Sequence, residues 1–165
     1  MREVNDEEAG WVIALSWVSA LEETARDFHG TRPRAFCQRA YEHAVKNFLS
    51  RLELDYDIQA NRTESIAAAV KEYIRVGVLG HIFKDASQFE LTEVNTNRLE
   101  ITVHKCPYLK SCQDLRDEGI SLRDLTCARI GCFRAAVQQL ADIDSDYEVT
   151  AFALEETCKG AIERK

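Results

Sequence analysis

Cysteines are the residues of this sequence with the widest choice of chemistry, because a thiol can pack in a core, ligate a metal or attack a substrate. The chain of 165 residues has six cysteines, and five of them lie in its second half. Its N-terminal residues lack the basic, apolar pattern of an export signal, so we expect a cytoplasmic protein with reduced thiols. Metal binding, thiol chemistry and plain burial are therefore the options for the five, which are Cys106, Cys112, Cys127, Cys132 and Cys158.

A zinc site needs about four cysteine, histidine or carboxylate ligands, and the usual ligand pairs are separated by about two to four residues. Only Cys127 and Cys132 have that spacing. We expect both on a helix, where positions five apart point about 140° away from each other. A metal site would therefore need Cys127 together with Cys106 or Cys158, and a carboxylate such as Glu156 could complete it. The compact spacings of iron–sulfur proteins are absent, and buried packing thiols are the competing interpretation.

Nucleophilic catalysis is the second option for these thiols. The candidate nucleophiles are Cys106, Cys112 and Cys127, with His81 or His104 as the activating base. A position near a helix N-terminus would also lower the pKa of Cys127. The sequence contains no serine-hydrolase, zinc-protease, phosphate-binding-loop or dinucleotide-binding motif. We therefore favour a binding protein over an enzyme.

The composition limits the partners of the chain. It is 45% hydrophobic and 30% charged, as in an ordinary globular domain. The net charge of −7 argues against nucleic acid and against an anionic membrane surface, which both require clustered lysine and arginine. No apolar run reaches the roughly 20 residues of a membrane-spanning helix.

Three helices are predicted before the cysteine-rich half, over residues 6–27, 33–53 and 63–78. The first is apolar around most of its circumference, which is typical of a helix that is buried on more than one side. Two interpretations follow, a central core helix or a helix that packs against a second subunit. Residues 1–30 are therefore a candidate dimerisation element, and residues 33–165 are the expected ligand-binding core.

The period of the pattern then changes from helix to strand. Two alternating runs around an Asn-rich turn at 95–97 predict a β-hairpin over 87–104. Ser121 and Asp124 resemble a capping box that opens a helix over 121–141. We expect a strand over 147–158, a turn at Lys159-Gly160 and a short last strand. The whole chain, 1–165, is thus predicted to be a single α+β domain with N-terminal helices packed on a mainly antiparallel sheet.

Several short motifs accompany this order of elements. They are G-V-L-G at 77–80, the hairpin 87–104, Cys106-Pro107, C-A-R-I-G at 127–131 and E-E-T-C at 155–158. With them, residues 35–163 resemble the 4-vinyl-reductase-type small-ligand-binding domain. That domain belongs to a superfamily that includes the TRAPP vesicle-tethering subunits and the haem–nitric-oxide sensors.

The resemblance implies a domain that encloses a small, mostly apolar molecule. Relatives act in aromatic-compound sensing and in (bacterio)chlorophyll or other tetrapyrrole metabolism, so a photosynthesis-related role is one expectation. If the ligand is a covalently attached bilin, we expect Cys112 to be the accessible attachment point. The pocket should lie between the hairpin and the Cys127 helix, with the candidate lining residues Phe89, Leu91, Ile101, Tyr108 and Phe133.

The resemblance also implies a zinc site. In the sensors of this family, zinc is held by a cysteine of the helix motif, by a Glu-x-x-Cys motif and by a second downstream cysteine. Carried over, the first two correspond to Cys127, Glu155 and Cys158. No cysteine follows Cys158 in this sequence. A cysteine of the 106–132 window must then substitute, and our candidate is Cys106.

The function expected from these observations is a non-catalytic sensor, carrier or assembly domain that forms a homodimer. Two alternatives stay open. Cys106-Pro107 is similar to a hydrolase branch that acts on a cyclic aminothiazoline acid, with Cys106 or Cys127 as the nucleophile. A protein-interaction adaptor without a ligand, like the tethering subunits, is the other.

Overall fold

The computed structural model describes residues 6–29, 34–152 and 157–165, and it confirms the predicted α+β class. The N-terminal part contains α1 (Asp6–His29), α2 (Arg34–Tyr56) and α3 (Ile66–Leu79). The hairpin follows a 3₁₀ turn η1 (Ala86–Gln88) and consists of β1 (Phe89–Asn95) and β2 (Arg98–His104). The C-terminal part contains α4 (Leu109–Asp117), the 3₁₀ turn η2 (Leu122–Asp124), α5 (Ala128–Ala141), β3 (Ser145–Phe152) and β4 (Thr157–Arg164).

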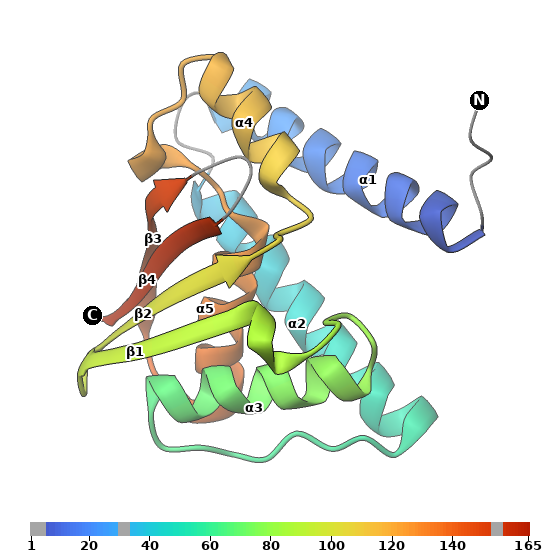
Figure 1. Ribbon diagram of the computed structural model, residues 1–165, viewed down its shortest axis with the longest axis vertical. Helices are drawn as coiled ribbons and strands as arrows, with labels where there is room; N and C mark the ends of the chain where they lie inside the picture. Colours follow the sequence, from blue (N-terminus) through green and yellow to red (C-terminus); the bar gives the residue numbers. More distant parts are fainter. Residues whose placement is uncertain (1–5, 30–33, 153–156) are drawn as a thin grey trace.

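The four strands form one antiparallel sheet in the order β1-β2-β4-β3, and the helices α3 and α5 pack on it (Figure 1). Side chains alternate along β2, so that Leu99, Ile101 and Val103 are buried while Glu100 is exposed. This one-sided pattern is typical of an antiparallel sheet with one face toward the core.

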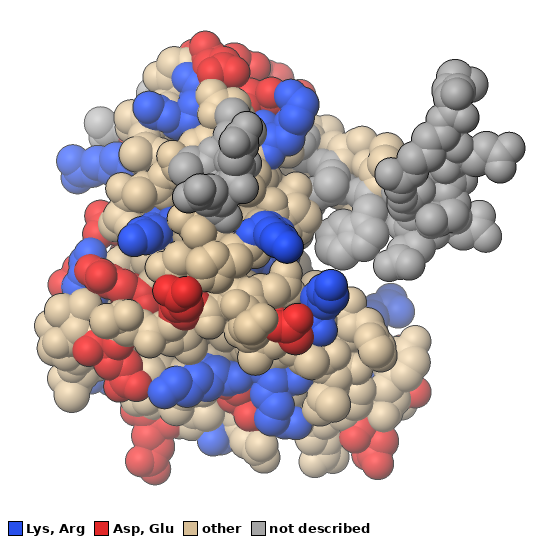
Figure 2. Space-filling model, in the orientation of Figure 1, with Lys and Arg blue, Asp and Glu red and all other residues tan. Residues whose placement is uncertain are grey.

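Charged side chains cover the strands on their other face. Arg98 of β2 forms ion pairs with Glu163 of β4 at 2.9 Å and with Glu148 of β3 at 2.8 Å. Figure 2 shows positive and negative side chains intermixed on the face that it views. This arrangement joins three strands and does not gather one sign of charge.

The predicted C-terminal strand over 147–158 is wrong in its extent. The structure has two strands there, β3 and β4, and residues 153–156 between them lie outside the described residues. Lys159 and Gly160, which we predicted as a turn, lie within β4. A Cβ atom on Gly160 would come within 2.8 Å of the Ile130 side chain. The glycine therefore marks a close approach of helix and strand, and not a chain reversal.

The predicted helix over 121–141 begins later than expected. Ser121 does accept the Asp124 N–H at 3.2 Å, but it caps only the short turn η2. The backbone is extended again at Leu125 and Cys127, and α5 starts after Cys127. The capping-box pattern therefore correctly predicted a local chain turn at Ser121. It predicted the start of the helix about two helical turns too early.

Among its described side chains, helix α1 contributes Ala25 to the core and packs Val18 against it, and most of the others are exposed. The interpretation of α1 as a central core helix is therefore wrong for most of its described length. The helix extends away from the rest of the molecule (Figure 1). Val12, Ile13, Trp17 and Phe28 are 59–81% exposed, whereas Ala25 near its end is buried. None of the helices in the described ranges is long and apolar enough to cross a bilayer.

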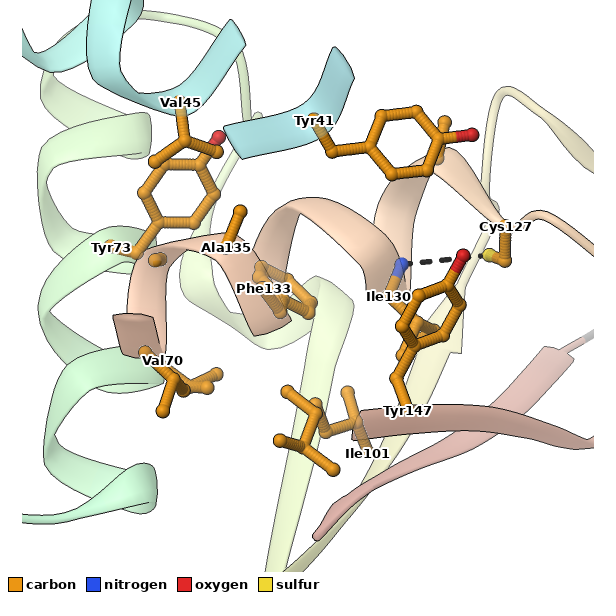
Figure 3. Packing of buried hydrophobic residues seen from close by; sticks show 14 of the residues in the cluster. Tyr41, Val45, Val70, Tyr73, Ile101, Cys127, Ile130, Phe133, Ala135 and Tyr147 are labelled. Atoms are coloured by element: carbon orange, nitrogen blue, oxygen red, sulfur yellow. Dashed lines mark hydrogen bonds between the residues drawn. The ribbon is translucent and has the colours of Figure 1, made fainter. Parts of the chain in front are cut away.

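Helix α5 is the centre of the core, and Figure 3 shows its side chains between those of α2, α3 and the sheet. Phe133 is fully buried and meets the rings of Tyr73, Phe83 and Phe89 edge to face, at centroid distances of 5.2–6.0 Å. Two turns of α5 also approach α2 closely, because Gly131 leaves room for the Tyr41 ring. The core is therefore a set of aromatic rings arranged around one helix.

We predict that Gly131→Ala destabilises the fold by about 1–3 kcal/mol, because its methyl group would overlap the Tyr41 ring. Gly10→Ala in α1 is the matched control, since nothing lies within 4 Å of its position. The control should be neutral or stabilising by up to about 1 kcal/mol. Urea unfolding of both variants checks this, and equal stabilities would show that the α2–α5 contact is not tight.

Candidate functional site

Four of the predicted thiols come together at one end of the sheet. Cys106 follows β2, Cys112 lies on α4, Cys127 is the N-cap of α5, and Cys158 is the second residue of β4. Each is at most 8% exposed. The side chains of Cys112 and Cys158 both hydrogen-bond to Cys127. The fold thus confirms that Cys127 meets Cys158, and it adds Cys112.

The cluster favours one thiolate, on Cys127. Hydrogen bonds from Cys112 and Cys158 hold the pKa of Cys127 well below its ordinary value, and the Ile130 N–H contributes at 3.5 Å (Figure 3). Donation of a hydrogen bond to Cys127 raises the pKa of Cys158, and burial raises that of Cys106. A thiolate at a helix N-terminus also gains from the helix dipole.

The thiols do not form a complete set of metal ligands in the structure. Within the described residues, no group of three or more histidine, cysteine, aspartate or glutamate side chains is placed so that it could hold a metal ion. The predicted ligand Glu155 lies outside the described residues. Cys127 is the N-cap of α5 and does not lie within the helix as we expected, whereas Cys132 does lie on α5. Cys132 is not among the side chains that hydrogen-bond to Cys127. A metal would therefore bind only if Glu155, or another group, completes the set.

The ring of His104, the histidine nearest to Cys106 in the sequence, contacts a carboxylate. The ring Nε2 of His104 lies 2.8 Å from a carboxylate oxygen of Glu90, its neighbour across the hairpin. His43 and His81 are exposed. In the residues that the structure describes, we find no hydrogen bond between a histidine ring and a cysteine, so the Cys–His pair of the hydrolase alternative is not formed there.

The six predicted ligand-binding residues lie in three places. Phe89 and Leu91 line an apolar groove, whereas Ile101 and Phe133 are fully buried behind it in the core. Tyr108 and Cys112 lie near the thiol cluster instead. Cys112 is buried on α4 and not accessible in a loop as we expected, because α4 packs it onto Cys127.

The groove runs between α3 and β1 and has a volume of about 650 Å³. Its rim carries two cations that are already paired. Lys71 lies 3.2 Å from Glu93, and Arg75 lies 2.7 Å from Glu72. The remaining lining is apolar, so the groove offers shape and contact area but no free charge. Its apolar residues are Ile74, Val78, Leu79, Ala86, Phe89 and Leu91.

Arg129 is the residue that sequence reasoning missed. It is only 9% exposed, and its guanidinium lies over the rings of Phe83 and Tyr108 at 4.6 and 5.4 Å from their centroids. The sequence does single out Arg129, because it is the only charged residue in the stretch Leu125–Cys132. A single charge within an apolar helix start is unusual, because burying it is costly.

Comparison with known proteins gives a fold and no family. No family model and no curated protein matches the chain. Among solved structures, the phenol-responsive sensory domain of the transcription activator PoxR with phenol is similar, with a TM-score of 0.55 and 12% identity over 91% of this chain and 74% of that one.

Two further structures, both from studies of haem, also match. One, from work on haem distortion in the H-NOX family, has a TM-score of 0.44 at 12% identity. The other, from work on haem redox potential and porphyrin distortion, has a TM-score of 0.46 at 11% identity. Each match covers 100% of this chain and 74% of the other. The similarity to the PoxR sensory domain shows the fold of this chain and no more.

Proposed function

We propose that this chain is a sensory domain that binds a small, neutral, largely apolar molecule in the groove between α3 and β1. The observation that carries the proposal is the groove itself. Its volume of about 650 Å³ lies within the about 300–1,000 Å³ that is usual for small-molecule sites. Two of the residues expected to bind ligand, Phe89 and Leu91, line it.

The charges at the rim support a neutral ligand. Lys71 and Arg75 each have a carboxylate partner, and Arg75 also donates to the Gln59 carbonyl at 2.7 Å. An acidic ligand would have to compete with these partners. A neutral aromatic molecule would need only contact with Phe89 and the aliphatic side chains.

Finer features of the proposal come from the resemblance. They are the 4-vinyl-reductase type, a cytoplasmic location, and a tetrapyrrole as an alternative ligand with a photosynthesis-related role. A tetrapyrrole in this groove would bind without a covalent bond or an axial histidine from the described part of the chain, in which no cysteine or histidine lines the groove. We therefore favour the neutral aromatic molecule.

We predict that phenol binds saturably in the groove and that Leu79→Asp lowers the affinity for phenol by at least about tenfold. Leu79 is 49% exposed on the groove wall, and a carboxylate there opposes an apolar ligand. Phenol titrations followed by the backbone amide signals of Phe89 and Leu91 measure the affinity.

Val94→Asp is the matched control for this experiment. Val94 is 51% exposed on β1 and is not part of the groove lining, so its substitution should leave the affinity unchanged. Equal affinities of the wild type and Leu79→Asp would place the binding site elsewhere. Shifts that do not saturate would remove the proposal.

Zinc binding at Cys106, Cys127, Glu155 and Cys158 is the second part of the proposal. The support is the contact of Cys127 with Cys158 and the thiolate character of Cys127, because zinc binds deprotonated thiols. Protein purified without a chelator should contain about one zinc per chain by elemental analysis.

Cys127→Ala should abolish this zinc content, and Cys37→Ala should not. Cys37 is an equally buried thiol on α2 and serves as the control. Less than about a tenth of an equivalent in the wild type would rule out the metal site. In that case the thiols only pack.

Homodimerisation through α1 is the third part of the proposal. Its exposed apolar side chains, Ile13, Trp17 and Phe28 among them, are what a second copy would cover. We expect a dimer by light scattering for the wild type and a monomer for Trp17→Glu. The control is Leu54→Glu at an 82% exposed position of α2. A wild-type monomer at all concentrations, or a dimer that survives Trp17→Glu, would contradict this assignment.

A further inference from the structure

Helix α5 carries two buried arginines, and only one of them has a carboxylate partner. Arg134 is 6% exposed and is held by Glu42, by Asp144 at 3.5 Å and by the Ser145 carbonyl at 2.7 Å. Arg129 is 9% exposed, and among the described residues no carboxylate pairs with it. Its Nε atom is buried without a hydrogen-bond partner.

The neighbours of Arg129 compensate its charge only in part. The rings of Phe83, Phe89 and Tyr108 lie within 4.6–5.8 Å of the guanidinium carbon, and the Cys106 thiol makes one contact with it. The Cys127 sulfur accepts the backbone N–H of Arg129. A guanidinium has five N–H donors, and the Nε–H of Arg129 is buried without a partner, so it can donate to a ligand.

A hollow of about 450 Å³ opens in front of this guanidinium. Lys84 and Lys105 stand on its wall, and Gln88 adds an amide. No acidic residue belongs to the lining among the residues that the structure describes. The nearest acid in sequence, Asp85, accepts a hydrogen bond from the Ser87 N–H at 2.8 Å. The lining residues are His81, Ile82, Phe83, Lys84, Gln88, Lys105, Pro107 and Arg129.

We propose that this hollow binds a small oxyanion, a carboxylate or phosphate group, with Arg129 as its principal partner and Lys84 and Lys105 at its entrance. A planar guanidinium binds two oxygens of such a group at once, and a partly dry site strengthens the contact. Burying an arginine side chain without a carboxylate partner costs free energy, unless a bound anion supplies the missing negative charge.

This site differs from the proposed groove in both place and polarity. The groove is apolar with paired cations, whereas the hollow has three unpaired cations among its lining residues in the described chain. The rings of Phe83 and Phe89, 4.9 Å apart, stand between them, since Phe83 lines the hollow and Phe89 lines the groove. The inference therefore goes beyond the proposed function and does not depend on it.

Benzoate and inorganic phosphate are the probes for this site. Each is titrated into the full chain at constant ionic strength, with chloride as the balancing anion. NMR follows the Arg129 Nε–H signal in the proteins that keep Arg129, and the backbone amide signals of residues 84 and 105 in all of them. We expect saturable shifts with at least one of the two probes and none with chloride. Binding of benzoate alone identifies an organic carboxylate, and binding of phosphate alone identifies a phosphate group.

Three variants locate the binding. Arg129→Gln should lower the affinity for the probe by about tenfold or more, and Lys105→Gln should lower it by about twofold to threefold. Arg123→Gln, at an exposed arginine outside the hollow, should have no effect. Shifts that stay linear, that chloride reproduces, or that survive Lys105→Gln and Arg129→Gln would overturn the inference. The wild-type titration and Lys105→Gln decide the matter if Arg129→Gln does not fold.

Discussion

The burial of α5 is the constraint on which the rest of the structure depends. This helix packs against α2 and α3 on one side and against β3 and β4 on the other. Glycines at two contact points, Gly131 and Gly160, allow that approach. Because α5 is held on nearly all sides, its first turns are fixed in position. Cys127 and Arg129, the two residues with the strongest chemical character, lie in those first turns.

Each feature of the candidate sites follows from that position. The N-cap role of Cys127 places its sulfur where helix N–H groups and two further thiols can stabilise a thiolate. Phe133, one turn further along, anchors the ring cluster that includes Phe89, and Phe89 forms part of the groove. The guanidinium of Arg129 contacts both the ring cluster, at Phe83 and Phe89, and the thiol cluster, at Cys106. The start of the same helix thus contributes to the thiol cluster and to the basic hollow, and Phe133 supports the groove from behind through its contact with Phe89.

The sequence predicted the parts of this structure whose signals are local. The hairpin was expected over 87–104 and spans 89–104, because alternation and an Asn-rich turn are contained within a few residues. Three predictions were wrong because they depend on contacts between residues that are distant in sequence. They are the strand over 147–158, the turn at Lys159-Gly160 and the start of α5. Gly160 and Cys127 are explained by contacts with residues far away in sequence, such as Ile130 and Cys158. The candidate ligand residues were apolar enough to suit either a pocket or a core, and only packing separated Phe89 and Leu91 from Ile101 and Phe133.

The central claim is that the groove between α3 and β1 holds a small molecule. Native mass spectrometry of the chain purified from its own cells, compared with Leu79→Asp prepared in the same way, tests it most directly. The account predicts, beyond the mass of any zinc, an excess on the wild-type chain that is lost on denaturation and is absent from the variant. An equal excess beyond zinc in both proteins, or no such excess in either, would contradict it.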